Sequence, residues 1–261
     1  MSEAAVAVLR DAATESRLSR LERTGLLTGD FPCFSDQALW QQSGIPLLLS
    51  CCGGKLQLQS RNRKLQPLAV DFSEGTMAHR SQQNVRAELV VKAVLGRNKQ
   101  RLPSVIDATA GLGRDSFLLA VLGCEVLMVE RHPVVGALLE DGLMRYQQEG
   151  DQAIASRLAF CSQDFLLAAL PPADVVYLDP MFPKRDKSAL VKKEMQLFKT
   201  MVGADTDSDS LLGAATALAR ERVVVKRPDK APFLADVKPT YSLSGRSSRF
   251  DIYQVGSKAG P

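Results

Sequence analysis

The chain has 261 residues, of which 45% are hydrophobic and 24% charged, and its formal net charge is +4; this composition is typical of a folded globular protein and neither requires nor excludes a nucleic-acid partner. No apolar run approaches the roughly 20 residues that cross a bilayer, and the first ten residues do not resemble a secretory signal, so we expect a cytoplasmic protein without a membrane partner. Five cysteines without a C-x-x-C pair and only two histidines argue against a disulfide framework and against a metal site.

Residues 1–72 are predicted to form a small α+β unit. Two apolar-rich runs separated by Gly53-Gly54 predict a β-hairpin, because both glycines can adopt positive φ. The predicted elements of this unit are a helix over Glu15–Thr24, the hairpin strands Leu47–Cys52 and Lys55–Ser60, and a third strand over Leu68–Phe72.

Residues 73–261 show helices alternating with buried strands, which predicts crossover connections and a Rossmann-like, doubly wound α/β domain with a mostly parallel sheet. The predicted helices cover Ser81–Leu95, Arg114–Leu122, Pro133–Tyr146 and Leu211–Ala219. The predicted strands cover Ser104–Ala108, Glu125–Val129, Leu158–Cys161, Val175–Leu178, Arg222–Lys226, Tyr241–Leu243 and Asp251–Val255.

A glycine-containing loop follows the first of these strands. Asp107 ends the strand, and Gly111 and Gly113 let the backbone turn sharply and approach a ligand before a helix begins. In sheets of this kind, ligands bind at the carboxyl ends of the strands. The loop therefore predicts a nucleotide-binding turn, although a tight turn without a ligand explains the same pattern.

Acidic residues at the ends of the next two strands strengthen the nucleotide interpretation. Glu130 is placed to accept hydrogen bonds from ribose hydroxyls, and Asp164 could accept from an adenine amino group or cap a helix. A dinucleotide fingerprint would have a third glycine or alanine where this chain has Ser116. The adjacent Arg114 and Asp115 suit a zwitterionic amino-acid tail better than a diphosphate, so we predict S-adenosylmethionine (SAM) as the cofactor.

The chemical end of the site is predicted at Asp179-Pro180, which follows a buried strand, with Phe182 three positions after the acid. Asp179 and a backbone carbonyl could accept both N–H groups of an aromatic amine and hold its nitrogen in line with a methyl donor. Phe182 could stack on the base, and Pro180 would stiffen the turn. A strand-ending Asp-Pro turn with Phe182 in the core is the alternative.

Basic residues follow this turn and a later strand, and we expect them to contact RNA phosphates, which set register and affinity without reading sequence. They are Lys184, Arg185, Lys187, Lys192, Lys193, Lys226 and Arg227.

Six segments together resemble the ribosomal RNA small subunit methyltransferase J family: DATAGLGRDS, ERHPVV, VYLDPMFP, KSALVKKEM, VVVKRP and RFDIY. The resemblance covers most of residues 70–255. It implies a class I methyltransferase fold, SAM as methyl donor (with S-adenosylhomocysteine, SAH, as product) without a metal, and N2-methylation of one guanosine in 16S ribosomal RNA, free or in the small ribosomal subunit. It also implies that the cofactor is lined by Arg114, Asp115, Glu130, Arg131, Asp164 and Asp179.

Two positions depart from the general methyltransferase pattern. Thr109 stands where the loop commonly has its first glycine, and Met181 replaces the second proline of the D/N-P-P-Y/F motif. Two other functions use the same features: an amino methyltransferase acting on DNA or on a protein glutamine, and a non-catalytic RNA-binding factor. No obligate protein partner is predicted.

Overall fold

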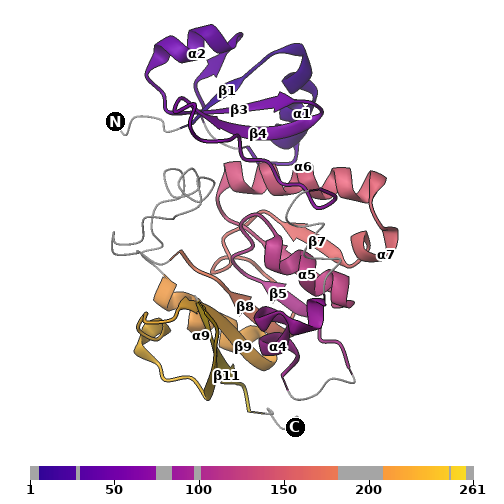
Figure 1. Cartoon of the computed structure of the whole chain (residues 1–261), viewed down its shortest axis with the longest axis vertical. Coiled ribbons are helices and arrows are strands. Elements are labelled where there is room, and N and C mark those ends of the chain that lie inside the picture. The colour runs from indigo at the N-terminus through magenta and orange to yellow at the C-terminus, as the bar shows by residue number, and fades with distance from the viewer. Residues whose placement is uncertain are drawn as a thin grey trace.

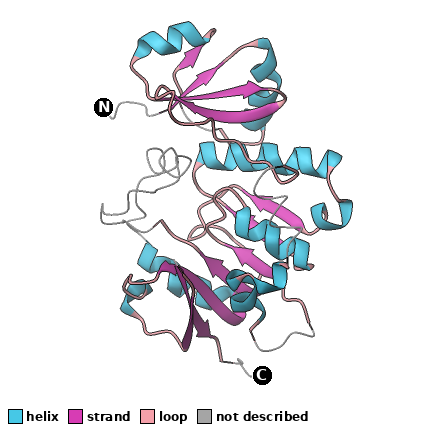
Figure 2. Cartoon of the chain, in the orientation of Figure 1, coloured by secondary structure: helices cyan, strands magenta, loops and turns pink. Residues whose placement is uncertain are grey.

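The computed structural model describes residues 6–27, 30–74, 84–96, 101–181, 208–246 and 248–256. The chain forms two sheets, a four-stranded one in the N-terminal unit and a seven-stranded one in the remainder (Figure 1). Helices flank both sheets (Figure 2). Within the described ranges, no helix combines the length and apolarity that crossing a membrane requires.

The N-terminal sheet has the strand order β2-β1-β3-β4, with β1 parallel to β2 and β3, and with β3 antiparallel to β4. Helix α1 begins three residues before the predicted start because the Asp11 carboxylate accepts the Thr14 N–H and caps the helix. The elements are β1 (Val6–Leu9), α1 (Ala12–Arg23), β2 (Cys33–Phe34), α2 (Gln37–Ser43), β3 (Leu47–Cys52) and β4 (Lys55–Ser60).

The predicted hairpin of β3 and β4 is confirmed, with Gly53 and Gly54 both at positive φ. The predicted third strand over Leu68–Phe72 is wrong. Only Leu68 pairs with this sheet, through an isolated antiparallel bridge to Leu58. The following residues leave the sheet edge and bury Val70 and Phe72 against the second unit, so their apolar alternation reflects a buried connection.

The large sheet has the strand order β10-β11-β9-β8-β5-β6-β7. Strands β7, β6, β5, β8 and β9 are parallel neighbours, whereas β11 runs antiparallel to both β9 and β10. The predicted Rossmann-like α/β fold is therefore confirmed. Its strands are β5 (Val105–Asp107), β6 (Val126–Val129), β7 (Leu158–Cys161), β8 (Ala173–Leu178), β9 (Ala219–Pro228), β10 (Tyr241–Ser244) and β11 (Ser248–Gln254).

The helices of this unit lie on both faces of the sheet (Figure 1). The helix predicted over Ser81–Leu95 is shorter in the described part, because Glu88 has an extended ψ of 136° that separates η1 from α4. The helical elements are η1 (Val85–Ala87), α4 (Leu89–Leu95), α5 (Arg114–Leu122), α6 (Pro133–Glu149), α7 (Gln152–Ala155), α9 (Ser208–Leu218) and η2 (Leu234–Asp236).

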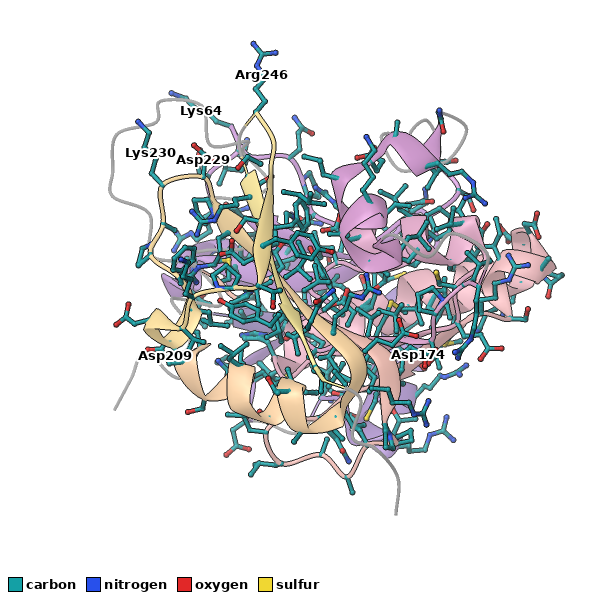
Figure 3. All side chains as sticks on the ribbon, turned by 90° about the horizontal axis from the view of Figure 1, so that it is seen from below. Lys64, Asp174, Asp209, Asp229, Lys230 and Arg246 are labelled. Atoms are coloured by element: carbon teal, nitrogen blue, oxygen red, sulfur yellow. The ribbon has the colours of Figure 1, made fainter. Side chains whose placement is uncertain are left out.

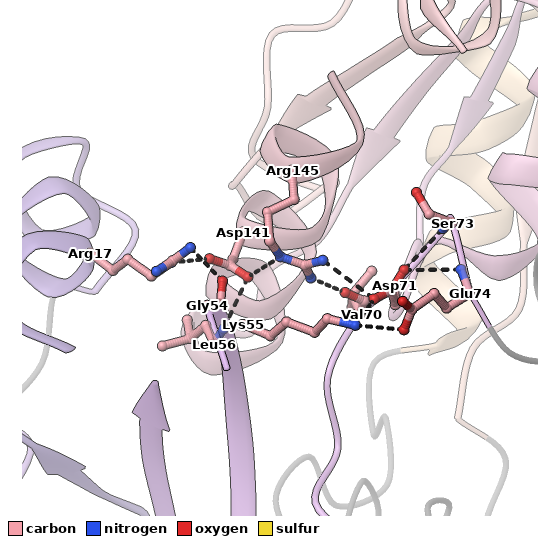
Figure 4. A network of polar contacts seen from close by, with 10 residues as sticks. All are labelled: Arg17, Gly54, Lys55, Leu56, Val70, Asp71, Ser73, Glu74, Asp141 and Arg145. Carbon is pink, nitrogen blue, oxygen red and sulfur yellow. Dashed lines mark hydrogen bonds and ion pairs between the residues drawn. The ribbon is translucent and has the colours of Figure 1, made fainter. Parts of the chain in front are cut away.

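Helix α6 joins the two units. The buried Asp141 carboxylate accepts from Arg17 Nε at 2.6 Å and from the Leu56 N–H at 3.0 Å, both in the N-terminal unit, and from Arg145 Nε at 3.0 Å on α6 itself (Figure 4). One hydrophobic cluster also runs through both units. Each unit also has a smaller cluster of its own. The division at residue 72 therefore separates the two sheets but crosses a shared cluster, and as a domain boundary it stays a proposal.

Candidate active site

The site lies where the strand order of the large sheet reverses. The chain moves from β5 outward through β6 and β7 and then returns to the other side of β5 with β8. The loops that follow the carboxyl ends of β5 and β8 therefore run in opposite directions. In sheets of this type, ligands bind between two such loops. The glycine loop follows β5, and Asp179 follows β8.

The loop after β5 is held in a tight conformation. Gly111 and Gly113 have φ values of 55° and 70°, a region that side chains with a Cβ rarely adopt. A Cβ on Gly113 would lie 2.8 Å from Leu139 Cδ1 and 3.1 Å from Phe72 Cζ. Both conformation and space thus restrict position 113 to glycine, and α5 begins directly after it.

Glu130 closes the same loop from the end of β6. Its Oε2 accepts the Gly111 N–H at 2.9 Å, and its Oε1 accepts the His132 N–H at 2.8 Å. The residue is only 9% exposed. A carboxylate oxygen can accept more than one hydrogen bond, and these two bonds fix the direction of the Glu130 carboxylate.

Three ionised side chains meet at the carboxyl edge of the sheet. Lys226 Nζ lies 2.8 Å from Asp115 Oδ2, at the start of α5, and 2.8 Å from Asp179 Oδ2, at the end of β8. The buried Tyr177 donates its hydroxyl to the same Asp115 oxygen at 2.7 Å. Together these three ions carry a net charge of −1, and the Asp179 side chain is 41% exposed.

Thr109 connects the loop after β5 to the end of β8. Its hydroxyl accepts the Asp179 N–H at 2.6 Å, and the neighbouring Ala108 N–H donates to the Tyr177 carbonyl at 3.0 Å. A glycine at position 109, as in the general loop pattern, could not make the first of these bonds. The departure therefore has a structural reason, which is to position the backbone of Asp179.

We expect Thr109→Val to lower both stability and turnover. The substitution keeps the shape of the side chain but leaves the Asp179 N–H without its acceptor, at a cost of roughly 1–3 kcal/mol. Urea unfolding and the kcat for methyl transfer measure the two effects. Thr109→Ser keeps the hydroxyl and should retain most of both, so a valine variant equal to the serine variant would contradict this role.

Asp107 is 2% exposed and lies behind the loop, where Oδ2 accepts the Ser116 hydroxyl at 2.5 Å. Burial raises the pKa of Asp107 from 3.8 to about 7, the Ser116 hydrogen bond opposes this, and the negative charge of Asp115 adds to it. The carboxyl thus changes its protonation state near neutral pH, which is unusual for an aspartate.

This raised pKa predicts a pH-dependent stability. Between about pH 4 and 7 the folded chain binds the proton more tightly than the unfolded chain, so this group's contribution to the unfolding free energy falls as pH rises through that window. The loss relative to Asp107→Asn, which cannot titrate, should be on the order of 3 kcal/mol. Urea unfolding of both proteins from pH 5 to 8 tests it. Parallel pH profiles would refute it.

The structure places the other predicted cofactor residues at the same edge. Arg114 is the half-buried first residue of α5, and Arg131 Nη1 lies 3.6 Å from Asp164 Oδ2. Pro180 is buried beside Asp179. The remaining predicted residues lie outside the described part of the chain: Phe182, Lys184, Arg185, Lys187, Lys192 and Lys193.

Two predicted RNA contacts have different surroundings from those expected. Lys226 points toward Asp115 and Asp179. Arg227 is 4% exposed and donates to the Pro232 carbonyl, at 3.2 Å from Nε and 3.0 Å from Nη2. A side chain buried in this way does not present its guanidinium to a phosphate, so the structure argues against the RNA role for Arg227.

The sequence did not predict the hydrogen bonds made by Thr109, Ser116 and Tyr177. It also predicted that Lys226 contacts RNA phosphates, whereas the structure places it against two carboxylates. A signal was available for Tyr177, because a tyrosine hydroxyl on a buried strand needs a polar partner. The position of Lys226 depends on the register of two strands distant in sequence, which no local pattern contains.

Comparison with known proteins agrees with this geometry. Residues 35–255 match a family described as "Putative SAM-dependent methyltransferase". The ribosomal RNA small subunit methyltransferase J of Actinobacillus pleuropneumoniae is 53% identical over 73% of this chain and 78% of its own length, and that of Pseudomonas aeruginosa is 55% identical over 72% and 74%. The chain belongs to the ribosomal RNA small subunit methyltransferase J family. A crystal structure of a SAM-dependent methyltransferase from Neisseria gonorrhoeae is 32% identical, covers 96% of each chain and has a TM-score of 0.71.

The methyl donor of this methyltransferase is therefore SAM. The side chains at this edge fit SAM, because a net negative group of side chains suits a cationic sulfonium, and the oriented Glu130 carboxylate suits the ribose hydroxyls. Within the described ranges, no three His, Cys, Asp or Glu side chains come together to hold a metal ion.

Proposed function

We propose that this methyltransferase modifies the exocyclic N2 amine of a guanosine in 16S ribosomal RNA, either free or within the small subunit. The names of its relatives support a ribosomal RNA substrate. The observation that carries the choice of an amine is the Asp179 carboxylate, which is 41% exposed and lies at the same edge as Glu130 and the Gly111 loop. An RNA substrate also fits the expected cytoplasmic location.

Guanine N2 needs assistance because its lone pair is delocalised into the ring. Asp179 would accept an N–H of the amine and orient the nitrogen, and its negative charge would stabilise the positive charge that develops there. Bound SAM supplies the electrophilic methyl group. Thr109 and Lys226 hold the backbone and the carboxylate of Asp179 in place.

We expect two groups of residues to contact the RNA, the predicted residues after Asp179 that lie outside the described ranges and exposed cations inside those ranges. Phe182 would stack on a flipped guanine, and Lys184, Arg185, Lys187, Lys192 and Lys193 would neutralise phosphates. Lys64 of the N-terminal unit and Lys230 and Arg246 of the second unit project from one side of the molecule (Figure 3). They add candidate phosphate contacts on that side.

The test is methyl transfer from labelled SAM to small subunits, free 16S ribosomal RNA, duplex DNA and a protein extract, followed by nuclease digestion and mass spectrometry of the nucleosides. We expect N2-methylguanosine from the small-subunit RNA and no label in DNA or protein. A different methylated nucleoside would refute the N2 assignment, and label in DNA or protein alone would refute the RNA substrate.

A further inference from the structure

Lys226 belongs to a different environment from the other basic residues of the chain. Its strand, β9, pairs in parallel with β8, and the last pair in register is Leu178–Val225. Asp179 directly follows the end of β8, and Lys226 is the next residue of β9, so the two residues lie beside each other, with Lys226 Nζ 2.8 Å from Asp179 Oδ2. Strand β9 continues to Pro228 and pairs with β11 on its other side, where Lys226 lies opposite Phe250. The lysine is thus anchored in the sheet, not in a loop.

The ammonium group of Lys226 connects the start of α5 with the end of β8. Its 2.8 Å contacts with Asp115 and Asp179 join a residue of the cofactor side to the residue that receives the amine. An ammonium has three N–H donors, so one group can serve two carboxylates at once. The lysine side chain is only 28% exposed, which strengthens both interactions relative to a solvent-exposed pair.

The charge of Lys226 persists at the pH of catalysis. Burial by itself lowers the pKa of a lysine, but the carboxylates of Asp179 and Asp115 outweigh burial and raise the pKa of Lys226 above its ordinary value of 10.5. The positive charge of Lys226 consequently lies between the negative charges of Asp115 and Asp179. It offsets the repulsion between these two partly buried carboxylates.

We propose that Lys226 is a positioning residue for methyl transfer, which holds Asp179 toward the target amine and offsets part of the negative charge that would otherwise bind the cationic cofactor too tightly. The first role rests on the proposed function, whereas the second concerns cofactor binding alone. SAM carries a sulfonium charge that SAH lacks. Catalysis gains only from interactions that are stronger in the transition state than in the ground state, so excess attraction for the sulfonium would slow its reaction.

The test compares Lys226→Met, which removes the charge at similar length, with Lys226→Arg, which keeps the charge but replaces a point cation with a planar fork. Lys92→Met is the matched control, because Lys92 is exposed on α4, which leads to the opposite, amino end of β5. Calorimetry without RNA gives the Kd for SAM and for SAH, and methylation of small subunits gives kcat and KM.

We expect Lys226→Met to raise the binding preference for SAM over SAH by on the order of tenfold. The same variant should lower kcat by on the order of 10²-fold, with a smaller change in the KM for RNA. Lys226→Arg should keep the wild-type binding preference and recover part of kcat, and the control should change neither. An unchanged ratio of the two Kd values overturns the charge role, and a wild-type kcat in Lys226→Met overturns the positioning role.

A variant that fails to fold and a wrong RNA substrate would each give a result that can be recognised. If Lys226→Met does not fold, Lys226→Gln, which also removes the charge, is tested in its place, and a wild-type kcat in that variant overturns the positioning role, whereas an unchanged ratio of the two Kd values overturns the charge role. If the wild-type chain methylates no small-subunit RNA, the proposed substrate is wrong, while the calorimetric comparison still tests the charge role of Lys226.

Discussion

Asp179→Asn should lower kcat by about 10²- to 10³-fold, the loss typical when one preorganised electrostatic group is removed from an active site. The amide keeps the shape of the side chain but loses the negative charge that stabilises the developing cation. It also removes one of the two ionic partners of Lys226. Single-turnover methylation of small subunits with saturating SAM measures the chemical step directly.

Cofactor binding should survive the same substitution. Glu130, the Gly111 loop and Asp115 stay in place, so the Kd for SAM should rise by no more than about tenfold from the loss of one nearby charge. Asp30→Asn, which neutralises an exposed acid in the N-terminal unit, is the control for a change of net charge. Retained turnover in Asp179→Asn would remove Asp179 from the catalytic role.

The order of strands and helices in the large sheet could be predicted because each element has a strong local pattern. Runs such as Val223–Val225 indicate a strand buried on both faces, and Pro133 marks the first turn of α6. Strand β2 was missed because its two residues are too few to show a period. The apolar run Val6–Leu9 of β1 was left unassigned, although it is as long as the predicted strand Leu158–Cys161. The Leu68–Phe72 alternation was misinterpreted because a buried connection between units shows the same pattern as a strand.

The candidate site could be predicted in outline from its strand ends, since the carboxyl ends of parallel strands meet at one edge. The links between those ends could not. The contact of Lys226 with Asp179 spans 47 residues and depends on the register of β9 against β8. In the sequence, Lys226 stands next to Arg227 and resembles part of a basic surface. Only the three-dimensional structure separates the two, because Lys226 points toward Asp115 and Asp179, whereas Arg227 is buried against the Pro232 carbonyl.

The junction between the two units offers the largest expected effect on stability. Asp141 is 7% exposed, and its carboxylate is shared by Arg17, Arg145 and the Leu56 N–H (Figure 4). Asp141→Ala would leave two guanidinium groups and a buried N–H without this acceptor, and breaking a buried ion pair from one side costs about 3–5 kcal/mol. We expect a decrease of that size in the unfolding free energy.

Urea unfolding checks this with two probes. Trp40 is the single tryptophan and is 1% exposed in the N-terminal unit, so its fluorescence reports on that unit, while far-UV circular dichroism reports on the whole chain. Because one hydrophobic cluster runs through both units, both midpoints should fall in Asp141→Ala. Glu149→Ala, at the exposed end of the same helix, should stay within about 0.5 kcal/mol of wild type. If Asp141→Ala behaved like this control, the polar network would contribute nothing to joining the units, and the shared apolar cluster alone would hold them together.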